Sequence, residues 1–193
     1  MYRIRSFVND ETLRMIYYSL MYPHLLYGIP IWGNADDTLI NSLLLFQNKA
    51  VRLISNKHHN VLSPFIVPVD PGIQWYVDTF TKVPSNPLFK SLRMLKVQDI
   101  FRAEALKFVY DSINQTNPFQ FHTYYRVPAN THNTGGNRNN NLDIPQPRTK
   151  TYGLKSIKYI GCLLWNNLSA YIRDKSSKNS FSKSVKDYYV NQY

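Results

Sequence analysis

An apolar stripe of helical spacing between residues 39 and 53 is the feature that most constrains how this chain can fold. Five apolar side chains recur there at intervals of 4, 3, 4 and 3 residues, which matches one face of an α-helix and not the alternation of a half-buried strand. We therefore predict an amphipathic helix whose stripe faces a hydrophobic core. Its members are Leu39, Leu43, Phe46, Ala50 and Leu53.

The pair Asp36-Asp37 precedes this stripe and looks like the paired aspartates of a two-metal polymerase site. Such a site needs carboxylates that converge on two ions about 4 Å apart, with a further aspartate supplied from a distant strand. Here the expected apolar flank is the polar Asn34, and only Asp10 lies upstream. We interpret the pair as the start of a helix, capped by Asn34 or Asp36 and complemented by the charge of Asp37. No catalytic residue is expected.

The first 57 residues are predicted to form an antiparallel helical hairpin. Asp10 can cap a first helix, which Pro23 bends or ends, and Gly28 and Pro30 connect it to the second helix.

Two segments of different character follow the hairpin. Residues 58–86 are rich in proline and have no sustained helical or alternating period, so they are predicted to be an irregular insertion. Residues 87–115 have helix-forming composition, with a break expected near residues 97–99 and Asp99 as the cap of the second piece.

Residues 116–151 are predicted to be a disordered linker. Asparagine occupies six of the twelve positions from Asn130 to Asn141, and such a segment buries too little apolar surface to offset its ordering entropy.

Residues 152–193 form the last predicted unit. A short β-like stretch is expected near residues 156–161, and a final helix after the cap candidate Ser180. The apolar residues of this segment are too few for an independent core, so it should pack against another part of the protein.

Positive charge is concentrated in this last part of the chain. The net charge is +11, and from Arg148 onward nine Lys or Arg residues stand against only two Asp. A basic patch of this kind attracts polyanions such as RNA or DNA, although a solvated lysine-rich face remains an alternative. The candidate phosphate contacts are Lys150, Lys155, Lys158, Arg173, Lys175, Lys178, Lys183 and Lys186. Tyr152, Tyr159 and Trp165 are candidate stacking groups, but Trp165 lies in an apolar cluster and is expected in the core.

Several other classes are not indicated by the composition. We find no run of 18 apolar residues and no apolar signal core after Met1, so neither a membrane span nor a secretion signal is predicted. Cys162 is the only cysteine, which excludes an internal disulfide framework. The histidines show no metal-ligand spacing, so we predict neither a metal site nor a cofactor.

Five sequence segments, in this order, resemble the C-terminal part of reverse transcriptases from non-LTR (LINE-type) retrotransposons of the jockey and CR1 kind. They are "YYSLMYPHLLYGIPIWGN", "LLLFQNKAVRLISN", "NPLFKSLRMLKVQDI", "SIKYIGCLLWNNLSAYI" and "FSKSVKDYY". Most of the resemblance is carried by Trp32-Gly33-Asn34, by the motifs Gln47 to Ala50 and Pro87 to Lys90, and by Leu164 to Asn166.

This resemblance implies a part of a larger enzyme. Residues 1 to about 57 would correspond to helices of the thumb, which grips the template-primer duplex, and the remainder to the post-thumb region. The family's catalytic aspartates lie upstream of this segment, so the chain alone is expected not to polymerise. Residues 59–84 look like an insertion relative to the family.

Three functional hypotheses follow. The chain is a sequence-independent nucleic-acid binder, or a structural fragment that associates with a reverse-transcriptase palm or with itself, or an active polymerase. The third has little support because Asp36 and Asp37 fit a helix start. A nuclear or cytoplasmic location would follow from nucleic-acid binding, but the sequence alone assigns no compartment.

Overall fold

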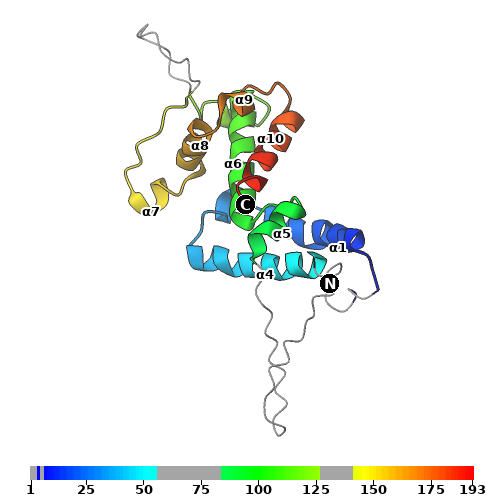
Figure 1. The fold of residues 1–193 in the computed structure, drawn as a ribbon. Helices are drawn as coiled ribbons and strands as arrows, with labels where there is room; N and C mark the ends of the chain where they lie inside the picture. Colours follow the sequence, from blue (N-terminus) through cyan, green and yellow to red (C-terminus); the bar gives the residue numbers. More distant parts are fainter. Residues whose placement is uncertain (1–3, 5–6, 56–83, 127–140) are drawn as a thin grey trace, which may run out of the picture.

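The computed structural model describes residues 4, 7–55, 84–126 and 141–193, apart from the side chains of Lys150 and Thr151, and these residues form a mainly α-helical fold (Figure 1). The predicted fold class is confirmed, because the described residues form helices and no strand. None of the described helices is both long and apolar enough to cross a bilayer. In chain order the elements are α1 (Asp10–Ile16), the π-helical η2 (Tyr17–Met21), α2 (Tyr22–Leu26), α3 (Ile29–Trp32), α4 (Asp37–Ser55), α5 (Ser85–Ser91), α6 (Val97–Ile113), the 3-10 helical η3 (Phe119–Phe121), α7 (Lys150–Gly153), α8 (Ile157–Asn166), α9 (Ala170–Arg173) and α10 (Lys178–Val190).

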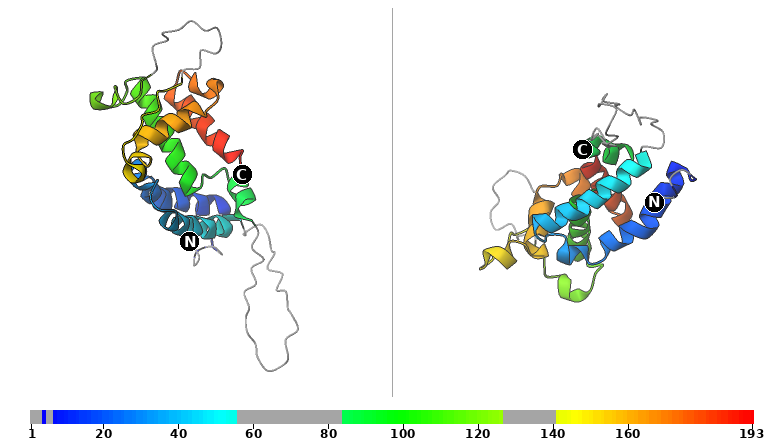
Figure 2. Two further views of the ribbon diagram at one scale, coloured as in Figure 1. Left: turned by 90° about the vertical axis from the view of Figure 1, so that its left-hand side faces the viewer. Right: turned by 90° about the horizontal axis from the view of Figure 1, so that it is seen from below.

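Helix α6 is the central element of the fold. The N-terminal helices lie across one of its ends, and α8 and α10 pack along it from two sides (Figures 1 and 2). Two clusters of buried residues result, one around α6 and one between α1, α4 and α5. The prediction that the C-terminal segment packs on another part of the protein is confirmed.

The first helix starts at Asn9 rather than at the predicted cap Asp10. Asn9 Oδ1 accepts a hydrogen bond of 2.7 Å from the Thr12 amide, which satisfies one free first-turn donor. Pro23 does not end this helix, because the π-helical turn η2 precedes it. In that turn the Tyr22 amide donates to the carbonyl five residues earlier, which widens the backbone where the proline ring would meet the preceding turn.

The predicted antiparallel hairpin is present. Gly28 reverses the chain with a positive φ of 64°, a conformation that glycine adopts without strain. The chain then passes through the short α3 into α4. Leu13 and Tyr17, near the start of the first helix, pack in one cluster with Val51 and Ile54, near the end of α4.

The predicted stripe of α4 is wrong in its register. Leu39 and Phe46 are 63% and 60% exposed, whereas Ile40, Gln47 and Ile54 are buried. The physical reason is that α4 is apolar on two adjacent lines, so a helical period alone does not decide which line faces the core. The sequence missed Gln47 as a core residue.

The predicted helical segment of residues 87–115 is confirmed, with different internal boundaries. Helix α5 begins at Ser85, and the break falls at residues 92–96, where Arg93 has a positive φ of 51°. Asp99 does not cap α6, because it lies inside the first turn and accepts a 2.6 Å hydrogen bond from the Tyr193 hydroxyl. The predicted irregular insertion lies, up to residue 83, outside the described residues.

The predicted disordered linker, residues 116–151, is too wide. Tyr125 is buried and its hydroxyl donates to the Ile157 carbonyl over 3.0 Å. Leu142 is also buried, and the Asn166 amide pairs with both its main-chain N–H and its C=O, at 2.7 and 2.9 Å. The asparagine-rich part, residues 127–140, lies outside the described residues.

Two local predictions for residues 152–193 are wrong. The expected β-like stretch lies in α8, whose cap Ser156 accepts a hydrogen bond from the Tyr159 amide. Helical spacing of its buried Gly161, Cys162 and Trp165 outweighs the local β-forming composition once α6 is there to pack against. The last helix starts after Ser177, so Ser180 lies inside its first turn.

Candidate nucleic-acid interface

Asp36 and Asp37 open α4 and are both exposed, as the helix-start interpretation predicted. The main-chain carbonyl of Asp36 accepts hydrogen bonds from the amides of Leu39 and Ile40. Asn34, the other cap candidate, instead donates to the Lys155 carbonyl over 3.2 Å. Across the described ranges there is no group of three or more acidic, histidine or cysteine residues arranged to hold a metal ion.

The structure divides the eight predicted phosphate contacts into three groups around α6. One group lies at α8, one in the connection from α9 to α10, and one on α10 itself. Because α8 and α10 lie on two sides of α6 (Figure 2), the eight residues do not form a single cluster.

The group at α8 consists of Lys155 and Lys158, which are both exposed. The Lys158 ammonium lies 5.1 Å from the centroid of the Tyr124 ring. A cation over an aromatic face is attracted by the ring quadrupole and remains available to an anion on its other side. The side chain of Lys150, the third predicted contact near this helix, lies outside the described residues.

The group between α9 and α10 has different partners for each cation. The Arg173 guanidinium donates to Asn141 Oδ1 over 2.9 Å, and Lys178 forms a 2.7 Å ion pair with Asp111. The Lys175 ammonium lies 3.7 Å from the centroid of the Tyr171 ring. A hydrogen bond to Lys175, and then its charge, lower the pKa of the Tyr171 hydroxyl.

The third group consists of Lys183 and Lys186, which lie about one helical turn apart on α10. Lys183 is exposed, whereas Lys186 is half-buried and faces Tyr18 of η2. Lys186 is thus the predicted contact that connects the C-terminal segment to the N-terminal hairpin.

The predicted stacking groups have different environments. Trp165 is 4% exposed and belongs to the core, as expected, so it is not free to stack on a base. Tyr159 is half-buried, whereas Tyr152 is 83% exposed. Sequence reasoning missed Tyr171, which is 75% exposed beside Lys175. Its i,i+4 spacing from Lys175 was a usable signal, whereas nothing in the sequence pairs Tyr124 with Lys158.

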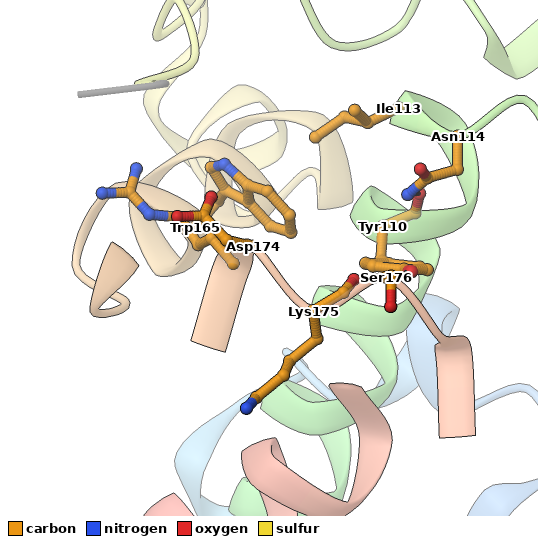
Figure 3. A pocket seen from close by; sticks show the side chains of 8 residues that line it. Tyr110, Ile113, Asn114, Trp165, Asp174, Lys175 and Ser176 are labelled. Carbon is orange, nitrogen blue, oxygen red and sulfur yellow. Dashed lines mark hydrogen bonds between the residues drawn. The ribbon is translucent and has the colours of Figure 1, made fainter. Parts of the chain in front are cut away.

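A pocket of about 370 Å³ lies between the end of α6, Trp165 and the connection from α9 to α10 (Figure 3). The Tyr110 hydroxyl donates to the Lys175 carbonyl across its floor, over 2.9 Å. The Lys175 ammonium points away from Trp165 in this view, toward the outside. The pocket therefore receives no charge from Lys175.

Most of the described predicted cations lack an acidic partner. Lys178 pairs with Asp111, but within the described part of the chain no ion pair is formed by Lys155, Lys158, Lys175, Lys183 or Lys186. Five positive charges are therefore not neutralised by carboxylates in that part.

Comparisons with family models, with curated proteins and with solved structures found no match to this chain.

Proposed function

We propose that the protein binds nucleic acid without sequence preference, through lysines of α8, α10 and the connection before α10. The supporting observation is that five predicted contacts form no ion pair with a described carboxylate. Exposed ammonium groups of this kind displace counterions from phosphates, which gives affinity that depends on salt and little on sequence. Tyr171 and Tyr124, each beside one of these lysines, are the aromatic groups best placed to contact bases.

A salt titration with matched variants tests this proposal. The variant Lys155→Gln/Lys183→Gln removes two exposed lysines without acidic partners. The control Lys107→Gln/Lys178→Gln removes two lysines paired with Glu104 and Asp111, and so makes the same change in net charge. Affinities for a short mixed-sequence duplex and single strand are measured by fluorescence anisotropy over a series of salt concentrations.

We expect the first variant to flatten the plot of log affinity against log salt by about 0.7 to 0.9 for each phosphate that a lysine no longer neutralises. The control should leave the slope close to that of the wild type. Equal effects of the two variants would mean that only overall charge matters, and an affinity independent of salt would exclude phosphate contacts altogether.

We further propose that the chain is a thumb and post-thumb relative of non-LTR reverse transcriptases that does not polymerise on its own. Its support is the ordered set of five sequence segments and the helical hairpin that precedes the remaining helices. Metal-dependent primer extension by this chain, abolished by Asp36→Ala, would overturn this proposal.

A second candidate function is association through an apolar surface of the hairpin. Large apolar side chains are exposed on α3 and α4, among them Ile31 at 90%, Leu45 at 62% and Phe46 at 60%. Exposed apolar surface of this kind favours protein contacts. Sedimentation at increasing concentration tests it: association that Leu45→Ser/Phe46→Ser removes would support an interface, and a wild-type monomer at all concentrations would count against self-association.

A further inference from the structure

A cleft between α1 and α10 brings together residues from the two ends of the chain. It has a volume of about 420 Å³. Its lining is contributed by α1 and η2 on one side and by a single α10 residue on the other. The lining residues are Glu11, Arg14, Met15, Tyr18 and Lys186.

Tyr18 forms a fixed aromatic wall of this cleft. Its ring meets the rings of Tyr17 and Tyr22 edge-on, with centroids 5.3 and 5.2 Å away. The Arg14 guanidinium and the Lys186 ammonium each lie 5.9 Å from the Tyr18 ring centroid. One ring therefore holds two cations near each other that are far apart in sequence.

These two cations form no ion pair with a carboxylate in the described part of the chain. Two further cations lie nearby, but each has a carboxylate of its own: Arg93 pairs with Asp187 and Lys107 with Glu104. Burial is the main cause that lowers the pKa of Lys186, and the charges of Arg14, Arg93 and Lys107 add to it, against the opposite effect of Asp187.

Glu11 is the one acid that lines the cleft. It lies one helical turn before Arg14, at the exposed start of α1, and the two side chains form no ion pair. The lining therefore carries one negative and two positive charges, with the two cations on the Tyr18 side.

We propose that this cleft binds a phosphate group between Arg14 and Lys186. The planar guanidinium offers two parallel N–H donors to two phosphate oxygens, and the ammonium supplies a point charge. An anion there also offsets the repulsion between the two cations, which the folded chain otherwise bears. The group is a phosphate of a nucleic-acid strand or of a small phosphoanion. In the first case the inference deepens the proposed function and rests on it.

Inorganic pyrophosphate is the first probe, with binding measured by calorimetry on the full chain at low salt. Arg14→Gln and Lys186→Gln remove one cation each from the cleft. Arg126→Gln and Lys183→Gln make the same changes at exposed positions outside it. Glu11→Gln removes the single acid of the lining. Circular dichroism of each variant verifies that it is folded.

We expect Arg14→Gln and Lys186→Gln each to weaken pyrophosphate binding about tenfold, in line with the removal of one charge-assisted hydrogen bond. The two control variants should change it less than about twofold, and Glu11→Gln should strengthen it. Absence of pyrophosphate binding, or equal reductions in the cleft and control variants, would overturn the inference.

Oligonucleotides with and without a 5′-phosphate then identify the source of the phosphate. Weaker binding of both by Arg14→Gln supports an internal phosphate, and weaker binding of the phosphorylated strand alone supports a terminal one. If oligonucleotides bind with the usual salt dependence but neither they nor pyrophosphate respond to the cleft variants, the cleft inference fails and the proposed function stands. If only pyrophosphate binds, the cleft is a small-anion site and the proposed function fails.

Discussion

The buried side-chain amide of Gln47 donates a hydrogen bond of 2.9 Å to the hydroxyl of Tyr17. The same amide nitrogen donates to the Leu95 carbonyl over 3.2 Å, and its oxygen accepts from the Val97 amide over 2.7 Å. One side chain of α4 thus joins η2 to the turn before α6. It connects the two clusters of buried residues, since Tyr17 belongs to one and Val97 to the other.

Replacing this amide should destabilise the protein strongly. Gln47→Met keeps the volume but leaves the Val97 N–H and the Leu95 C=O buried without a partner, and each such group costs about 1 to 3 kcal/mol. We expect the free energy of unfolding in urea to fall by about 2 to 4 kcal/mol. Gln120→Met, at an exposed position, is the control and should change it by less than about 0.5 kcal/mol. A decrease for Gln47→Met as small as that of the control would contradict the role assigned to the amide.

Gln47 and Asn166 show how far sequence reasoning could reach. The helical stripes predicted the fold class because a period of 3.6 is a local property. Each amide lies beside an apolar line of its helix and clamps both main-chain groups of a distant segment or segments, around Leu95 in one case and at Leu142 in the other. Such a role depends on which segment packs there, so no local pattern predicts it.

The candidate interface shows the same limit. The sequence indicated the basic segment as a whole, but it could not show that Lys178 is neutralised by Asp111, 67 residues away. Nor could it show that Lys186 meets Arg14 across the cleft. Charge composition predicts the sign of a partner, whereas the pairing of each cation follows from tertiary packing.

The Tyr193 hydroxyl is predicted to stabilise the start of α6. It donates to Asp99 Oδ2 over 2.6 Å and accepts from the Lys96 amide over 3.0 Å, and the Asp99 carboxylate is almost fully buried. Tyr193→Phe leaves that carboxylate with Arg102 alone, and a hydrogen bond to a charged group contributes about 1.5 to 3 kcal/mol. We expect a loss of unfolding free energy in this range. Tyr152→Phe, at an exposed tyrosine, should have almost no effect, and equal effects of the two changes would contradict the prediction.

Gly161 is predicted to resist a substitution that usually favours a helix. An exposed helical Gly→Ala change stabilises by about 1 kcal/mol. At Gly161, however, a Cβ would lie 2.6 Å from the Tyr125 hydroxyl oxygen and 2.8 Å from a Val109 methyl carbon. We expect Gly161→Ala to lower the melting temperature, with a cost of about 1 to 3 kcal/mol from overpacking. Gly161→Ala in a Val109→Ala background should cost less than in the wild type. A melting temperature raised by Gly161→Ala alone would show that α8 does not approach α6 so closely.

Stability is predicted to fall at alkaline pH because buried tyrosines resist ionisation. Burial raises the pKa of Tyr17 from 10.0 to about 12, and burial also raises the pKa of Tyr22, Tyr125 and Tyr189. For such a group the folded state keeps its proton while the unfolded state loses it. The contribution is therefore fully present below about pH 10 and is lost as the pH rises through about 12.

For Tyr17 alone the loss across this window is about 2 to 3 kcal/mol. Urea unfolding between about pH 8 and pH 11.5 measures it. Tyr17→Phe should be less stable than the wild type near neutral pH, because Gln47 loses a hydrogen-bond partner, but its stability should decline less steeply above pH 10. The exposed Tyr27→Phe should follow the wild-type decline. If all fifteen tyrosines ionise near pH 10 while the helical signal persists, the buried environment of Tyr17 is contradicted.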